Sequence, residues 1–234
     1  MADNSYTVFN AMVDIVASPG KALDNVKHHT SWLWAPLLIT IALACGLMAF
    51  YYSWVDFDWL VEETIRQVPA EDRAESADAI RNFMTRNTSM MTTVIAIVVM
   101  IFIIYLLQAV YFHLANKVTS GAKIGFGQWF SFSAWTSFVG VFGSIAGFIA
   151  IFMASTNQMP AESLQVFSLN SILIHAEAGD PWFRWASSLS LLNFWMLFLA
   201  SIGYARWTGS AMVKSAMIAC LPWVLIFGIW AATI

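Results

Sequence analysis

The sequence predicts an all-α protein that crosses a membrane several times. Of its 234 residues, 59% are hydrophobic and only 11% are charged, whereas about 25% of the residues in a soluble domain are charged. The stretch 87–116 contains no Asp, Glu, Lys or Arg. A helix of about 20 apolar residues crosses a hydrocarbon layer and satisfies its own backbone hydrogen bonds there. We therefore expect a polytopic membrane protein with five transmembrane helices, an N-terminal interfacial helix and an external helical hairpin between the first two spans.

Residues 1–31 predict a cytoplasmic helical arm. Within residues 6–17, four apolar side chains recur at helical spacing and form one face of an amphipathic helix: Phe9, Met12, Val13 and Val16. Such a face suits binding to a bilayer surface. The alternative is a soluble arm that packs on nothing.

A second short helix is expected to follow the first. Ser18 suits its N-cap and Pro19 its first helical position. This helix leads into the transmembrane part of the chain, residues 32–234.

Apolar runs between polar connections place the five spans at about 32–54, 90–115, 128–154, 185–205 and 215–234. Asp180 and Pro181 suit the N-cap and first position of the helix that opens the fourth span. Gly209 suits a left-handed cap after the fourth span, and Ser210 suits the N-cap of the fifth. Pro222 should kink the fifth.

Two polar segments, 55–89 and 155–184, are expected on the external side. The first is acidic and broken by Pro69, which predicts a helical hairpin. Its acids form a solvated helix face, or they attract cations or a basic partner.

Small residues follow one another along the third predicted span and allow a neighbouring helix to approach closely. The stripe is Ser133, Ser137, Gly140, Gly143, Ser144 and Gly147. Internal packing is the first interpretation, and a homo-oligomer face is the second.

The cations predict the orientation, because short loops rich in Lys and Arg stay in the cytoplasm. One side would hold Lys21, Lys27, Lys117, Lys123, Arg206 and Lys214. The other side would hold many acids with Arg66, Arg73, Arg81, Arg86 and Arg184, and most of these arginines belong to the hairpin. We expect a cytoplasmic N-terminus and an external C-terminus in a bacterial inner membrane.

The sequence points to no catalytic chemistry. An ionisable residue at mid-span would suggest transport or catalysis, and no predicted span has one at its middle. The histidines have no ligand spacing: His28, His29, His113 and His175. We expect no catalytic residue, metal or cofactor, and the formal net charge of −3 offers no basic surface for nucleic acid.

A few polar side chains within the spans could line a path for a lipid or solute. They are Tyr105, Gln108 and Asn116 on nearly one face of the second span, and Asn193 in the fourth. Such groups more often bond between helices and stabilise their packing.

Three segments of the chain form a recognisable set: SPGKALDNV, SGAKIGFGQWFSFSAWTSFVG and NFWMLFLASIGYARWTGSAMVKSAMIACLPW. Together they resemble the Yip1-domain family in its compact bacterial form. The residues that fit the family's pattern are Pro19, Trp195, Gly203, Gly209, Lys214 and Ala216. A proline that members often carry in the third span is absent here, which predicts a straighter helix.

The resemblance implies five spans and a cytoplasmic N-terminus. Eukaryotic members act in vesicle trafficking with small GTPases through a long cytosolic region. This sequence does not contain that region, so the resemblance does not carry the GTPase partnership over. Our hypothesis is a non-catalytic protein that organises or shapes the bilayer or scaffolds partners. The alternative is a small transporter, channel or lipid-handling protein.

Overall fold

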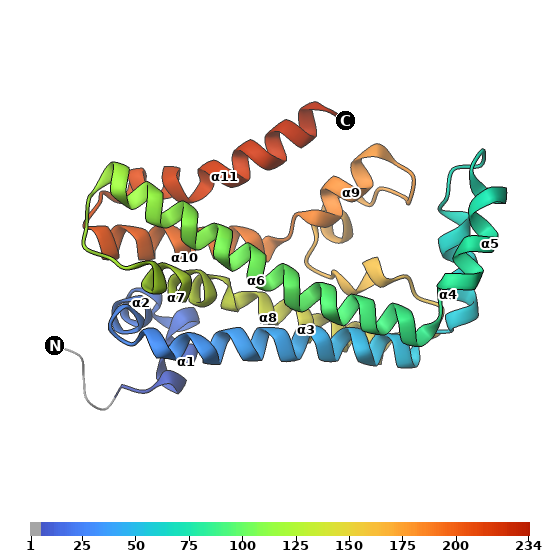
Figure 1. Cartoon of the computed structure of the whole chain (residues 1–234), viewed down its shortest axis with the longest axis horizontal. Coiled ribbons are helices and arrows are strands. Elements are labelled where there is room, and N and C mark those ends of the chain that lie inside the picture. The colour runs from blue at the N-terminus through green and yellow to red at the C-terminus, as the bar shows by residue number, and fades with distance from the viewer. Residues whose placement is uncertain (1–5) are drawn as a thin grey trace. The chain divides into compact units, whose positions relative to one another are not determined.

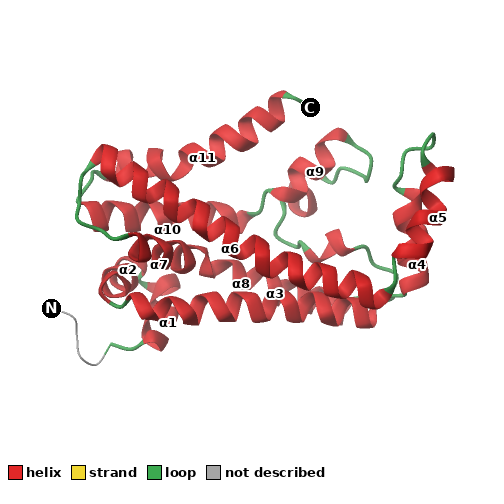
Figure 2. Ribbon diagram, viewed as in Figure 1, coloured by secondary structure: helices red, strands yellow, loops and turns green. Residues whose placement is uncertain are grey.

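The computed structural model describes residues 6–234, which form helices, connecting loops and one isolated β-bridge but no β-strand (Figure 2). The arm was predicted from residue 1, so its first five residues lie outside the described part. Figure 1 labels the main helices. In chain order the elements are α1 (Val8–Ala17), α2 (Pro19–His28), η1 (Thr30–Leu33), α3 (Trp34–Trp54), α4 (Phe57–Arg66), α5 (Arg73–Phe83), α6 (Arg86–Thr119), α7 (Phe126–Ser137), η2 (Phe138–Gly140), α8 (Val141–Met153), η3 (Ala161–Leu164), η4 (Asn170–Ile174), α9 (Pro181–Ser188), α10 (Leu191–Thr208) and α11 (Met212–Ala232).

Four helical segments are long and apolar enough to cross a membrane: Thr30–Trp54, Arg86–Thr119, Phe126–Met153 and Met212–Ala232. They cover the first, second, third and fifth predicted spans. The second is longer than predicted, because α6 continues beyond the apolar run at both ends.

The fourth predicted span, 185–205, is not one continuous helix. Asp180 and Pro181 do open a helix as predicted, and the Asp180 carboxylate accepts from the backbone N–H of Trp182 at 2.7 Å. That helix is the short α9, however, and it ends at Ser188. The rest of the predicted span lies in a separate helix, α10, which begins at Leu191.

A backbone pairing with an earlier segment separates α9 from α10. The Leu169 N–H donates to the Leu189 carbonyl at 2.7 Å, and the Leu191 N–H donates to the Phe167 carbonyl at 2.9 Å. Leu189 is extended, with φ −96° and ψ 127°. These hydrogen bonds replace the helical ones at this point, so the helix cannot continue through residues 189 and 190.

The third predicted span is not a continuous α-helix. Residues Phe138–Gly140 form a 3₁₀ turn between α7 and α8. Just before it, the Thr136 hydroxyl donates to the Phe132 carbonyl at 2.9 Å. Ser and Thr hydroxyls that bond back to the preceding turn bend helices without any proline.

The chain forms two compact units, which are described separately here. The first contains residues 6–41, 100–141 and 192–234. Its core is a cluster of aromatic rings from α6, α7 and α10, with centroids 4.9 to 5.9 Å apart: Phe112, Trp129, Phe132, Tyr204 and Trp207. All five side chains are buried, so this cluster holds the three helices together.

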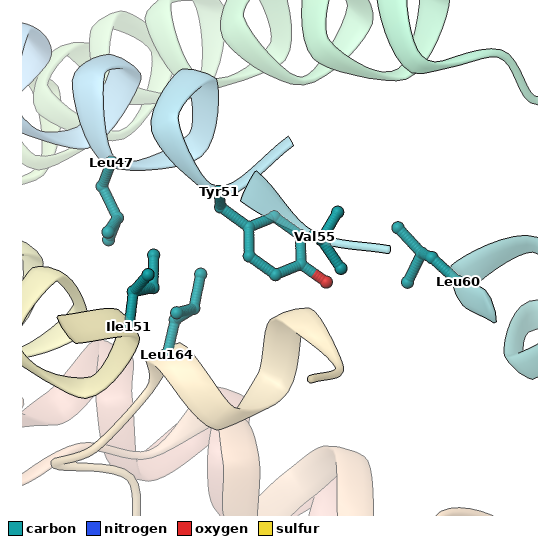
Figure 3. Packing of buried hydrophobic residues seen from close by; sticks show 6 residues of the cluster. All are labelled: Leu47, Tyr51, Val55, Leu60, Ile151 and Leu164. Atoms are coloured by element: carbon teal, nitrogen blue, oxygen red, sulfur yellow. The ribbon is translucent and has the colours of Figure 1, made fainter. Parts of the chain in front are cut away.

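The second unit contains residues 42–99 and 142–191. Side chains of α3 and the start of α4 point toward side chains of α8 and η3 (Figure 3). The cluster is Leu47, Tyr51, Val55, Leu60, Ile151 and Leu164. The Tyr51 hydroxyl is not left unsatisfied beside these apolar side chains, because it donates to the Met159 carbonyl at 2.8 Å.

One side chain satisfies the end of α3 in this unit. The Arg86 guanidinium donates to the carbonyls of Tyr52 and Val55. The last carbonyls of a helix have no partner within the helix, so Arg86 ties the beginning of α6 to the end of α3.

Candidate functional site

The arm predicted at the N-terminus is a pair of packed helices. Thr7 and Asn10 form a reciprocal capping box at the start of α1: the Thr7 N–H donates to the Asn10 side chain at 2.9 Å, and the Asn10 N–H donates to the Thr7 hydroxyl at 3.3 Å. Ala11 and Ile15 of α1 are fully buried where α1 packs on α2. Ser18 stands at the predicted N-cap of α2, but its side chain makes no capping bond, and Pro19 is the first helical residue.

A polar cluster joins α1 to α2. The Lys21 ammonium lies 3.0 Å from the Asp14 carboxylate, and the Tyr6 hydroxyl donates to the same carboxylate at 2.9 Å. Lys21 and Tyr6 together hold the pKa of Asp14 below its usual value, and burial with the bond to Asp14 raises the pKa of Tyr6. The Asp14 side chain is therefore directed toward α2.

Hydrogen bonds and an ion pair attach α2 to the end of α10 within the first unit. The indole N–H of Trp207 donates to the Leu23 carbonyl at 2.8 Å, and the Lys27 ammonium donates to the Trp207 carbonyl at 2.9 Å. Arg206 pairs with Asp24 through two guanidinium nitrogens. The arm is thus built onto the C-terminal end of α10 and is not a free segment.

The opposite face of α1 carries the four predicted membrane-binding residues, and it is uncovered. Phe9 is 67% exposed, Val13 52% and Val16 40%, while Met12 is half-buried. Large apolar side chains held at the surface of an ordered helix indicate a binding face. No described part of the chain covers it.

Three connections meet near this arm at one end of the first unit. Besides the contacts of α2 with α10, the Lys214 ammonium donates to the Thr119 carbonyl at 2.9 Å, which joins the start of α11 to the end of α6. The Gln128 amide donates to the Lys27 carbonyl at 2.9 Å, which joins α7 to the arm. This end therefore brings together the connections whose cations predicted a common side.

The residues of the small-residue stripe lie in different surroundings. Ser133 and Ser137 are buried in α7, and the Ser133 hydroxyl bonds back to Trp129. A Cβ on Gly140 would lie 2.8 Å from the flexible end of Met196, whereas one on Gly147 would lie 2.6 Å from Leu47. Gly143 and Ser144 are half-buried.

The residues of the predicted polar path come together only in part: Tyr105 and Gln108 both hydrogen-bond with Ser137. Gln108 accepts from the Ser137 hydroxyl at 3.5 Å, while Asn116 donates to the Ala122 carbonyl at 2.8 Å in the connection after α6. Tyr105 packs in an apolar cluster with Leu37 and Ala134. Asn193 lies further along the chain, half-buried in α10.

Of these, only Gln108 lines the groove of about 430 Å³ that α6, α7, α10 and α11 form in the first unit. Most of the groove's lining is apolar. Its Thr136 and Tyr111 hydroxyls already donate to backbone carbonyls. The groove therefore offers apolar surface and no chain of free polar groups.

The residues of the family-like pattern lie along α2, α10 and α11. Gly203 permits the tightest contact, because a Cβ there would lie 2.4 Å from the Phe132 ring. Gly209 has φ +70°, as its predicted left-handed cap requires, but the N-cap position of α11 is Ala211 and not Ser210. Trp195 and Ala216 are half-buried in α10 and α11.

The family model of the Yip1 domain matches residues 13–233, nearly the whole chain. The chain belongs to the Yip1 domain family. Comparison with curated proteins and with solved structures finds no match. The protein is therefore a Yip1-family membrane protein with several helices able to cross the bilayer.

The sequence analysis missed the residues that fix the arm of this Yip1-domain protein. Asp24 and Arg206 are far apart in the chain, and so are Leu23 and Trp207. Nothing in their spacing indicates a contact. The available signal was that α2 carries buried apolar residues, Ala22, Leu23 and Val26, which require a partner.

Proposed function

We propose that this protein is a non-catalytic, five-span membrane protein that organises or shapes the bilayer, and that α1 binds the cytoplasmic membrane surface. The observation that carries the proposal is the exposed face of Phe9, Val13 and Val16 on a helix whose other side is fixed to the protein. Burying a large apolar side chain contributes about 1.5–3 kcal/mol. The bilayer surface is the partner that such a face suits best.

The four candidate spans become five if α10 also crosses the membrane, as the fourth span in chain order. Its 18 residues span about 27 Å at 1.5 Å per residue, close to the thickness of the hydrocarbon layer. Its polar Asn193 and Arg206 lie near its two ends. With α10 as a span, the chain crosses the bilayer five times and its termini lie on opposite sides.

The orientation follows from the end of the first unit that holds the arm. Lys27, Arg206 and Lys214 all contact neighbouring segments there, and the same short connections carry Lys117 and Lys123. Cytoplasmic connections carry the excess of Lys and Arg, which favours a cytoplasmic arm and an external C-terminus in a bacterial inner membrane.

A scaffolding or shaping role fits the interior better than transport does. The Gln108 amide accepts from the Ser137 hydroxyl, and the groove beside Gln108 is apolar. A solute path would need polar groups that converge on one cavity. The helix pair α1 and α2 is instead attached to the protein and exposes an apolar face. Insertion of such a face into one leaflet would expand that leaflet and curve the bilayer.

The test is the shape of vesicles that contain the full chain. We would reconstitute the parent and the variant Phe9→Asp with Val13→Asp at equal protein-to-lipid ratio, and measure vesicle diameters by cryo-electron microscopy. The parent should give smaller vesicles than lipid alone, and the variant should lose this effect. Asn10→Asp with Ala17→Asp adds the same charge beside the apolar face and should behave like the parent.

Two outcomes would contradict the proposal. The parent could leave vesicle diameters unchanged, which would remove the shaping role. The two double variants could also behave alike, which would show that charge rather than the apolar face matters.

A further inference from the structure

The connection between α8 and α10 displays large apolar side chains in an unusual place. In the short helix η4, Ile172 is 45% exposed, Leu173 72% and Ile174 39%. Three consecutive apolar residues at the surface of a polar connection form a patch that water does not favour. The sequence analysis treated this stretch only as part of an external polar segment.

Hydrogen bonds hold the backbone of this segment in place. The Asn170 side chain accepts from the Ala176 N–H at 2.8 Å and donates to the Ala176 carbonyl at 3.2 Å. The His175 N–H closes the helix on the Asn170 carbonyl at 2.9 Å. These bonds join residue 170 to residues 175 and 176, on either side of Leu173. The backbone therefore holds Leu173 and its neighbours at the surface.

The neighbouring helix α9 adds aromatic surface to the patch. Trp182 is 42% exposed and lines the same hollow as Ile174. It packs edge-on against Trp185 with the ring centroids 5.5 Å apart. Tryptophans beside aliphatic side chains are typical of the boundary between headgroups and acyl chains.

The position of the connection along the chain says what covers the patch. It begins directly after Met153, the last residue of a segment able to span the membrane. Its other end is tied back through the bond from Leu169 to Leu189, just before α10 starts. A segment attached to the start of a span lies near a bilayer surface, and this step rests on the proposal above that α10 is a span.

The charges near the patch indicate which part of the lipid it contacts. The loop beyond Ile174 carries Glu177 and Asp180, and α9 carries Arg184. This set does not attract anionic headgroups. Contact with lipid would therefore depend on apolar insertion and not on charge.

We propose that Ile172, Leu173, Ile174 and Trp182 form a second membrane anchor, inserted into the leaflet at which α8 ends. The anchor acts on lipid acyl chains just below the headgroups and needs no anionic lipid. It does not depend on the binding of α1, which belongs to the other unit.

The test uses the full chain, one copy per lipid nanodisc of zwitterionic phospholipid. Cys45 and Cys220 are replaced by alanine, and an environment-sensitive fluorophore is attached at Leu173→Cys. The matched control carries the fluorophore at Glu177→Cys in the same loop. Each sample is quenched with lipid brominated near the headgroup and, separately, with aqueous iodide.

The label at residue 173 should be quenched by brominated lipid, shielded from iodide and blue-shifted relative to the label at residue 177. Equal quenching of both labels by iodide would overturn the proposal, because the patch would then face water. Shielding from iodide without quenching by brominated lipid would also overturn it, because protein and not lipid would cover the patch. A label at Ile172→Cys repeats the measurement if the variant at residue 173 does not fold.

Discussion

The hydroxyl of Tyr111 in α6 donates to the carbonyl of Ile218 in α11 at 2.6 Å. Ile218 lies four residues before Pro222, which stands inside α11 and has no N–H to offer that carbonyl. The tyrosine thus supplies the hydrogen bond that the proline removes. One side chain compensates the proline and also joins α6 to α11.

Replacing Tyr111 by Phe should lower the unfolding free energy in detergent by about 1 kcal/mol, because the Ile218 carbonyl loses its partner. The control is the same change in a Pro222→Ala background, where the restored N–H can bond to Ile218. The cost of Tyr111→Phe should be clearly smaller there. If the cost is the same in both backgrounds, the tyrosine does not compensate the proline.

The glycines of the third span should differ in their sensitivity to a side chain. Gly147→Ala should destabilise by about 1–3 kcal/mol, because its Cβ would overlap Leu47 and lie 3.3 Å from the Leu164 backbone. Gly140→Ala should cost less, since the end of Met196 can move. Gly228→Ala is the control, because nothing lies within 4 Å of that position. Thermal melting in one detergent measures all three, and equal melting at 147 and 228 would show that the contact is not tight.

The attachment of α1 to α2 should weaken in acid. The folded-state pKa of Asp14 is lowered by Lys21 and Tyr6 from its ordinary 3.8, so the ion pair stabilises at pH values above about 4 and its contribution is lost as the pH falls through the lowered pKa. Lys21 is largely exposed, so the contribution is at most about 1 kcal/mol. A spin label at Ala17→Cys should become more mobile below pH 4. In Asp14→Asn the label should already be mobile at pH 7, and its mobility should not change with pH.

Topology separates a four-span from a five-span chain. Fusion reporters at the C-terminus should behave as external, and so should a tag inserted between Glu62 and Asp78, while an N-terminal reporter stays cytoplasmic. If α10 does not cross the membrane, the two termini will lie on the same side. A cytoplasmic tag in the hairpin would reverse the orientation of every connection.

Helix caps and turns could be predicted from the sequence, because each depends on residues that are near each other in the chain. Pro19, Asp180 and Gly209 occupy the predicted cap or turn positions. The break before α10 could not be predicted, since it depends on pairing with residues 167–169. The 3₁₀ turn in the third span follows a back-bonding Thr136 hydroxyl, which the sequence analysis did not weigh.

The sequence predicted the exposed apolar face of α1 but not the contacts that attach the arm to the rest of the protein. The spacing of Phe9 and Val13 indicated an apolar face, and the structure leaves that face exposed. The attachment of the arm depends on Asp24 and Arg206, whose pairing joins distant parts of the chain. No periodicity along the sequence encodes such a contact.

The most direct test of our account is the depth of α1 in a bilayer, measured on the full chain in nanodiscs. A spin label at Val13→Cys should be more accessible to oxygen than to a water-soluble nickel reagent, and a label at Asn10→Cys should show the reverse. Apolar burial at about 1.5–3 kcal/mol per side chain exceeds the pull of Lys21 and Lys27 on anionic lipid at about 1 kcal/mol each. The depth at residue 13 should therefore persist in about 1 M salt, which screens charges beyond about 3 Å. A label at residue 13 that is open to the nickel reagent, or that reaches the lipid only at low salt, would contradict the proposed membrane-binding role of α1.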